Sequence, residues 1–441
     1  MRHFAERLQR EGMSELESVR KADLFARCRN ALQGQESLAF FVPGRIEVLG
    51  KHTDYAGGRS LLCALERGIA VLATPRTDRI IRVTDATSGE TRELALDAAA
   101  EARRGDWSNY VAAVARSLAR NFAGASRGAE IAFASDLPAS SGMSSSSALV
   151  IAIFLVLDAV NDLHSDETFR SIITSKETLG NYLGAVENGR SFGPLAGDLG
   201  VGTLGGSQDQ TAILCCRAGM LSQYSFCPVR AEGEVSLPED RVFVVAFSGV
   251  GASKTSNALH QYNEASLAVS EILTLWNEAM ARHDGCLADA TGTNAECAER
   301  IRAMIRASRS AEFTPHRLLE RFEQFVEESY DIIPQVSDAF ARCDLVSVGE
   351  LVDRSQYNVE TLLGNQIPET IALAQTAREL GADAASAFGA GFGGSVWALA
   401  SASDAEAFSR AWRDAYAQQF PTAAASSEFF VTRAGPGAVK L

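Results

Sequence analysis

A polar segment near the start of the chain, residues 42–58, gathers side chains that can bind charged groups or move protons. An apolar run precedes it at 38–42 and another follows at 61–74, so we expect two strands that present the segment between them. A polar hairpin turn without chemistry is the alternative for such a segment, but the motifs farther along the chain argue against it. The candidate side chains are Arg45, Lys51, His52 and Asp54.

A second segment combines glycine, serine and a long apolar run. The run at 149–157 predicts a buried helix, and the loop before it offers hydroxyls and unpaired N–H groups at the positive end of the helix dipole. That combination binds phosphate, although a serine-rich turn that only caps a core helix is a common alternative. The loop residues are Gly142, Met143, Ser144, Ser145, Ser146 and Ser147.

Two carboxylates stand near a third glycine-rich segment. Glu187 ends a predicted helix at 166–188, where the helix dipole disfavours a negative charge, so a metal or another functional partner is expected there. A surface glutamate is the alternative. Asp209 follows a loop that reaches Gly206, just before an apolar run at 211–215.

One glycine pattern is set aside. Residues 200–205 read GVGTLG and satisfy the dinucleotide fingerprint GxGxxG, but no strand precedes them and no clear helix follows. The phosphate-loop pattern GxxxxGK[ST] is absent from the sequence as well. Nucleotide chemistry in this chain is therefore not of the Rossmann or Walker type.

Composition limits the class of protein. The chain has 441 residues and a formal charge of −14, which predicts two domains and argues against nucleic acid as a partner. No apolar run is long enough to span a membrane, and the first residues lack a secretory signal. Eight cysteines without CxxC pairs suggest reduced thiols in a cytoplasmic protein.

The remaining pattern predicts a mixed α/β fold. We expect helices at 14–33, with Ser14 as its cap, and at 109–119, and strands at 68–74, 79–83, 128–134 and 241–247. A long helix carrying Tyr262 follows, helices fill 264–380, and a glycine-rich turn lies between strands within 385–399. A polar stretch at 229–240 places the boundary between the predicted domains, 1–218 and 219–441, near residue 218.

Three of these segments resemble the motifs of GHMP kinases, and of galactokinases in particular, in the order in which that family has them. They are residues 44–58, which read GRIEVLGKHTDYAGG, residues 138–148, which read PASSGMSSSSA, and residues 389–394, which read GAGFGG. Met143 stands where the family motif usually has Leu, and Ala390 stands where it usually has Gly. Two departures concern charge: Glu47 stands where galactokinases usually have Asn, and Lys51 where they have Glu.

The resemblance implies two α/β lobes with the active site in the cleft between them, and Mg-ATP as phosphate donor. It implies catalytic roles for Arg45 and Asp209, and sugar contacts from Lys51, His52, Asp54, Gly206 and Tyr262. The loop from Gly142 to Ser147 would bind the ATP phosphates, and Ser146 and Glu187 would hold Mg²⁺. The loop between Glu187 and Asp209 is longer than galactokinases have, which makes the match of Glu187 less secure than that of Asp209.

The implied reaction is phosphorylation of a monosaccharide, at its anomeric hydroxyl, by a monomer or weak homodimer. Lys51 offers donors and a positive charge toward the sugar's C6, so a sugar acid such as galacturonate is the favoured substrate, with galactose as runner-up. A solvated loop lysine is the alternative reading. A ligand sensor on a retired kinase scaffold and a kinase of mevalonate- or homoserine-like alcohols are the competing functions.

Overall fold

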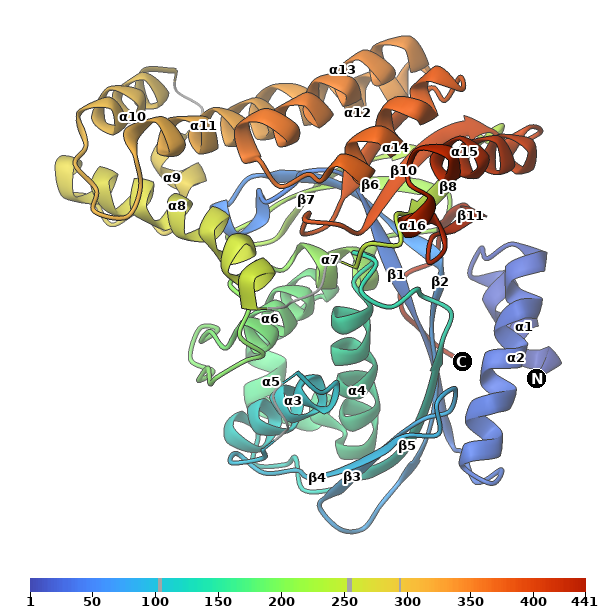
Figure 1. The fold of residues 1–441 in the computed structure, drawn as a ribbon. Helices are drawn as coiled ribbons and strands as arrows, with labels where there is room; N and C mark the ends of the chain where they lie inside the picture. Colours follow the sequence, from blue (N-terminus) through green and yellow to red (C-terminus); the bar gives the residue numbers. More distant parts are fainter. Residues whose placement is uncertain (102–104, 252–255, 293–294) are drawn as a thin grey trace.

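The computed structural model describes the whole chain except residues 102–104, 252–255 and 293–294, and it describes residues 256–262 by their backbone alone. It contains two β-sheets with helices on their faces (Figure 1). The α/β fold predicted from the sequence is confirmed.

The larger sheet carries the polar segment. Its strand order is β13 (Val439–Lys440), β1 (Leu38–Leu49), β2 (Arg59–Pro75), β5 (Ala129–Ser135), β3 (Ile80–Asp85) and β4 (Thr91–Ala95). Strand β2 also pairs with β12 (Ala434–Gly435) and with β6 (Met220–Ser225). Strand β6 in turn pairs with β7 (Arg230–Ser236). All pairs are antiparallel except β3 with β5.

The first strand is longer than the apolar run that predicted it. β1 continues to Leu49, so Arg45 and Glu47 project from a strand and not from a loop. The pairing with β2 shifts register between Pro43 and Arg45 and again after Glu47. These irregularities let a strand continue through a polar sequence while its side chains are re-aimed.

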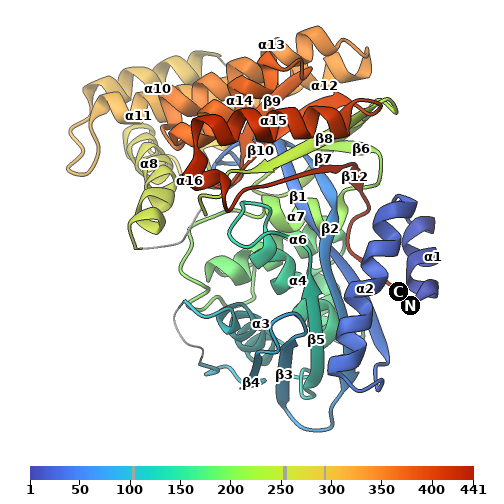
Figure 2. The same cartoon turned by 45° about the vertical axis from the view of Figure 1, so that its right-hand side comes forward.

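Helices cover both faces of this sheet (Figure 2). One face carries α3 (Ser108–Asn121), α4 (Ser145–Asn161), the short η2 (Leu163–Ser165), α5 (Glu167–Ile172), α6 (Lys176–Asn188) and α7 (Gln208–Cys215); the other carries α1 (Arg2–Arg10) and α2 (Glu15–Ala31). The single helix predicted at 166–188 is two helices, because the chain leaves helical geometry at Ile173 and the Ser175 side chain caps a new start.

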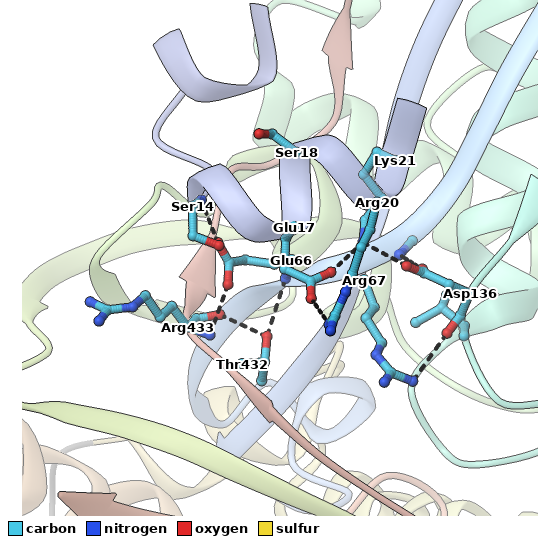
Figure 3. Close-up of polar contacts among 12 residues, drawn as sticks. Ser14, Glu17, Ser18, Arg20, Lys21, Glu66, Arg67, Asp136, Thr432 and Arg433 are labelled. Carbon is cyan, nitrogen blue, oxygen red and sulfur yellow. Dashed lines mark hydrogen bonds and ion pairs between the residues drawn. The ribbon is translucent and has the colours of Figure 1, made fainter. Parts of the chain in front are cut away.

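Buried polar groups anchor α2, the second of the two N-terminal helices, to the larger sheet (Figure 3). Lys21 is fully buried and donates to Glu17 and Asp136 at 2.6 and 2.5 Å. Ser14 occupies the cap position of α2 as predicted, but its side chain makes no capping bond; its N–H donates to Glu66 instead. Since Asp136 immediately precedes the loop at 137–144, α2 supports that loop from behind.

The second sheet has the order β11 (Glu428–Thr432), β8 (Arg241–Phe247), β10 (Ser395–Ser401) and β9 (Ala384–Phe388). Helices α14 (Pro368–Glu379), α15 (Ala405–Gln419) and α16 (Pro421–Ala424) pack on it. The glycine-rich turn at 389–394 joins β9 to β10, as the sequence predicts. The predicted boundary at residue 218 stays a prediction, and the sheets do not divide there, since β6 and β7 follow it and pair in the larger sheet.

The helices predicted at 264–380 are also present, and they lie in the chain between β8 and β9 of the smaller sheet. They are α8 (Ser256–Met280), α9 (Leu287–Thr291), α10 (Ala295–Ala307), α11 (Pro315–Val326), α12 (Ile333–Ala341) and α13 (Leu345–Asn358), with π-helical segments η3 (Glu327–Ile332) and η4 (Val359–Leu363). The short 3-10 helix η1 (Asp54–Ala56) lies between β1 and β2 and packs against this helical region.

Candidate active site

Arg45 and Asp209, far apart in the sequence, meet at the centre of the site. The Nε of Arg45 donates to Oδ1 of Asp209 at 2.8 Å, and Nη2 lies 2.8 Å from the same oxygen. Nη1 donates to the carbonyl of Gly142 at 2.5 Å. A guanidinium that is 4% exposed therefore joins the carboxylate to the serine-rich loop. Asp209 lies in the first turn of α7, where the helix dipole favours a negative charge.

The serine-rich loop opens α4 as predicted. Ser144 is the residue before the helix and has a left-handed conformation, with φ of 60°. The first N–H groups of α4, on Ser145, Ser146 and Ser147, have no intrahelical acceptors by geometry, so they face out of the helix end. The buried Ser144 hydroxyl has no hydrogen-bond partner among the described residues. This end of the helix can therefore accept a phosphate group.

Ser147, rather than Ser146, faces the second carboxylate. Its hydroxyl donates to Oε2 of Glu187 at 2.8 Å and lies 3.5 Å from Oδ2 of Asp209. Gln210 donates to the same Glu187 oxygen at 2.6 Å. The residues described include no group of three or more His, Cys, Asp or Glu able to hold a metal. A hydroxyl and one carboxylate beside a phosphate site nevertheless fit Mg²⁺, which takes few protein ligands and completes its shell with phosphate and water.

Asp54 and His52 are held in fixed orientations by the loop after β1. The Asp54 carboxylate accepts from the Gln208 N–H at 3.1 Å and lies directly against Gly206, where a Cβ would approach it to 2.3 Å. Burial raises the pKa of Asp54. The His52 ring lies 2.9 Å from the Tyr55 hydroxyl and 3.1 Å from the Ala390 carbonyl.

The protonation of His52 follows from these neighbours. Burial lowers the pKa of His52 to about 4, so the ring is neutral at pH 7. Because a carbonyl only accepts, Nε2 carries the proton toward Ala390 and Nδ1 accepts from Tyr55. The imidazole thus links the polar loop to the glycine-rich turn of the second sheet, and it also lines a pocket of about 210 Å³ together with Asn365 and Phe392.

Lys51 is fully buried, so the interpretation as a solvated loop lysine is wrong. Its ammonium group has no hydrogen-bond partner within the part of the chain that the structure describes. Glu47 is buried nearby and accepts from the Gly389 N–H at 3.3 Å. Burial raises the pKa of Glu47 to about 7, against the opposing effect of the positive charges on Arg45 and Lys51.

One predicted site residue cannot be placed by its side chain, and three residues that contact the site have no signal in the sequence. Tyr262 is on α8, but its side chain lies outside the described residues. Arg321, Gln324 and Glu328 of the helical region contact the backbone of residues 50–52 and belong to no motif. Only their unusual burial as polar side chains reveals them, and a sequence does not show burial.

Three family models match the chain in the regions that build this site. They are the galactokinase galactose-binding signature at residues 29–75, the GHMP kinases N terminal domain at 109–189 and the GHMP kinases C terminal model at 336–418. The chain resembles GHMP kinases in all three regions. The first model covers Arg45 to Asp54, and the second covers the serine-rich loop and Glu187.

Comparisons with individual proteins agree with this resemblance. The galactokinase of Chloroflexus aurantiacus is 28% identical over 382 residues, which cover 85% of this chain and 87% of that protein. A galactokinase of Actinobacillus pleuropneumoniae is 33% identical over 178 residues, covering 40% and 44%.

Solved structures of kinases share the fold of this chain. The crystal structure of Lactococcus lactis galactokinase complexed with galactose has a TM-score of 0.78 at 23% identity and covers 96% of this chain and 100% of that one. L. major mevalonate kinase in complex with R-mevalonate has a TM-score of 0.52 at 13% identity, with coverage of 91% and 97%. The two-sheet architecture is therefore shared with these kinases.

No helix among the described residues is both long and apolar enough to cross a membrane.

Proposed function

We propose that this phosphotransferase is a galactokinase-like sugar kinase, which transfers the γ-phosphate of Mg-ATP to the anomeric hydroxyl of galactose or of its C6 acid, galacturonate. The observation that carries the proposal is the Arg45–Asp209 pair, hydrogen-bonded to the phosphate-binding loop within reach of the Ser147–Glu187 pair. Phosphoryl transfer needs positioning and charge neutralisation more than covalent help, and these residues supply both.

Each residue of the centre has a distinct role in the proposed reaction. Asp209 accepts a hydrogen bond from the sugar hydroxyl, orients it toward the phosphate and takes its proton. Arg45 holds the Asp209 carboxylate in place and keeps a permanent positive charge beside the loop, where negative charge on the transferring group is stabilised. The N–H groups that open α4 bind the phosphates and exclude water from them.

Glu187 and a serine hydroxyl of the same loop would hold Mg²⁺. When bound, the ion neutralises the phosphate oxygens of ATP. Ser147 already donates to Glu187, and the neighbouring Ser146, the ligand that the family resemblance implies, is half-buried at the same helix end. Asp54 and His52 would hold the sugar from the loop after β1, and Gly206 leaves the space for the Asp54 carboxylate.

The burial of Lys51 favours the sugar acid. A buried charge without a partner is costly, so a ligand that supplies the counter-charge gains binding energy. A C6 carboxylate would form a charge-assisted hydrogen bond with the ammonium group, whereas a C6 hydroxyl offers only a neutral acceptor. The positive charge of Lys51 also lowers the pKa of the buried Glu47, so the two positions that differ from the usual galactokinase residues influence each other.

A panel of neutral sugars and uronic acids with Mg-ATP, scored for ADP release, tests the proposal. We expect turnover with galacturonate, with galactose or with both, and loss of turnover in Asp209→Asn. Release of ADP with mevalonate- or homoserine-like alcohols only, or with no acceptor at all, would refute it.

The eight cysteines are all free, which supports a reducing, cytoplasmic location for the reaction.

A further inference from the structure

Three buried side chains of one helix form hydrogen bonds with the backbone of residues 50–52, the loop that would hold the sugar. They are Arg321, Gln324 and Glu328, which we call the backbone clamp, and each is fully buried. Arg321 and Gln324 lie on α11 and Glu328 on the π-helical segment η3 that continues it. The groups they hold belong to three consecutive residues, Gly50, Lys51 and His52.

Each side chain of the backbone clamp forms a hydrogen bond with one of these three consecutive loop residues. Glu328 accepts from the Gly50 N–H at 2.8 Å, and Gln324 donates to the Lys51 carbonyl at 3.1 Å. Arg321 donates to the His52 carbonyl and lies 3.4 Å from the Tyr55 hydroxyl that bonds the His52 ring.

The clamp is itself braced. The Nη1 of Arg321 donates to the Gln324 amide oxygen at 2.6 Å. The Ser355 hydroxyl of α13 donates to Glu328 at 2.8 Å. Arg321 and Gln324 therefore hold each other, and Ser355 of α13 holds Glu328 separately, so the rotamers of all three side chains are fixed by more than the loop alone.

The helix presents these residues on one face because their spacing is i, i+3 and i+7. Pro334 lacks an N–H and its ring crowds the carbonyl of Tyr330, which is the physical reason for π-helical geometry just before it. The same face meets Gly58, where a Cβ would approach the Ser329 hydroxyl to 2.3 Å. Glycine at this position lets the end of the loop lie directly on the helix.

We propose that Arg321, Gln324 and Glu328 are positioning residues for the sugar, because they fix the peptide units that carry Lys51 and His52. This inference rests on the proposed function. Sheet pairing cannot satisfy the backbone groups of 50–52, since β1 ends at Leu49, so the clamp replaces the missing partners. The clamp comes from a different part of the chain than Arg45 and Asp209, so sugar position and phosphate chemistry are set by separate elements.

Gln324→Met tests the proposal with little change of volume. Methionine can neither donate to the Lys51 carbonyl nor accept from Arg321, so the peptide that carries Lys51 loses its fixed position. We expect KM for the preferred sugar, and its Kd measured by calorimetry without ATP, to rise about tenfold, since small misplacements of positioning groups have large effects. KM for ATP should stay within about twofold, because the phosphate loop is on another element.

The matched control is Glu323→Gln, one residue away on the same helix. Glu323 pairs with Arg302 at 2.7 Å and faces α10, away from the loop. It should cost stability without changing either KM. Where Gln324→Met fails to fold, Ser355→Ala replaces it, because it removes only the brace on Glu328 and should raise the sugar KM about threefold.

Each outcome of these measurements either supports or overturns the positioning role of the backbone clamp. A rise in the sugar KM and Kd confined to the clamp variants supports the positioning role. An unchanged sugar Kd, equal rises for sugar and ATP, or the same effect in Glu323→Gln overturns it while leaving the kinase intact. A wild type that binds and phosphorylates no sugar overturns the proposed function, and the inference with it.

Discussion

The charge at position 51 makes the sharpest prediction about substrate choice. We choose Lys51→Met because the side chains have similar length and the change removes only the ammonium group. Lys51→Glu would place a second carboxylate beside the buried Glu47 and confuse specificity with repulsion. In Lys51→Met, Glu47 can take up a proton, since its pKa is already about 7, and no uncompensated charge remains.

The magnitude follows from the complete burial of Lys51. A hydrogen bond between charged groups contributes about 2–3 kcal/mol, which is roughly 30- to 150-fold in kcat/KM for galacturonate. A galactose hydroxyl would lose about 1 kcal/mol, or about fivefold. The selectivity for the acid should therefore fall by about 6- to 30-fold.

The assay is kcat/KM for both sugars by ADP release, in wild type and variant, at saturating Mg-ATP. Lys440→Met, on an exposed strand end of β13, is the control and should change neither value. A wild type that prefers galactose, or a Lys51→Met variant that weakens both sugars alike, refutes the sugar-acid hypothesis and leaves the kinase proposal standing.

Three further predictions concern the phosphate site and pH. Asp209→Asn and Arg45→Ala should each lower kcat by about 10² or more, and near-wild-type turnover in either would contradict their assignment. Replacing Ser145 and Ser146 by Phe should abolish calorimetric binding of a non-hydrolysable ATP analogue; surviving affinity would move the nucleotide elsewhere. Because the pKa of Glu47 is about 7 in the folded protein and ordinarily 4.5, the folded state holds the extra proton between these values, and its stabilising effect is lost as pH rises through them. Urea unfolding should show the stability of wild type falling by up to ~3 kcal/mol relative to that of Glu47→Gln from pH 4.5 to 7, because Gln does not titrate; parallel curves would contradict the burial of a titrating carboxyl.

Local chemistry was predictable from the sequence wherever a motif is continuous. The serine-rich loop before α4 and the glycine-rich turn between β9 and β10 follow from backbone and dipole rules that act over a few residues. The meeting of Arg45 with Asp209 was expected from the family resemblance alone, since the two residues lie 164 positions apart.

What the sequence could not show depends on burial and on helical phase. The sequence suggests that Lys51 is a surface residue, but it is fully buried in a region where α11, which carries no motif, contacts its backbone. Among four consecutive serines, the one that faces Glu187 is set by the rotation of α4, so Ser146 and Ser147 are indistinguishable in sequence. The break between α5 and α6 lies in a stretch without Gly or Pro, the usual signals of a helix end.

The strand connections restrict how the two sheets can move. The chain passes from the larger sheet to the smaller between β7 and β8 and returns between β11 and β12, within a few residues each time. A body tethered at one point can swing in any direction, but a body tethered at two points can rotate only about the line that joins them. Any rotation of one sheet relative to the other is therefore confined to the axis through these two connections. Arg433, whose N–H is bonded to Glu66, lies on that axis, where displacement is smallest.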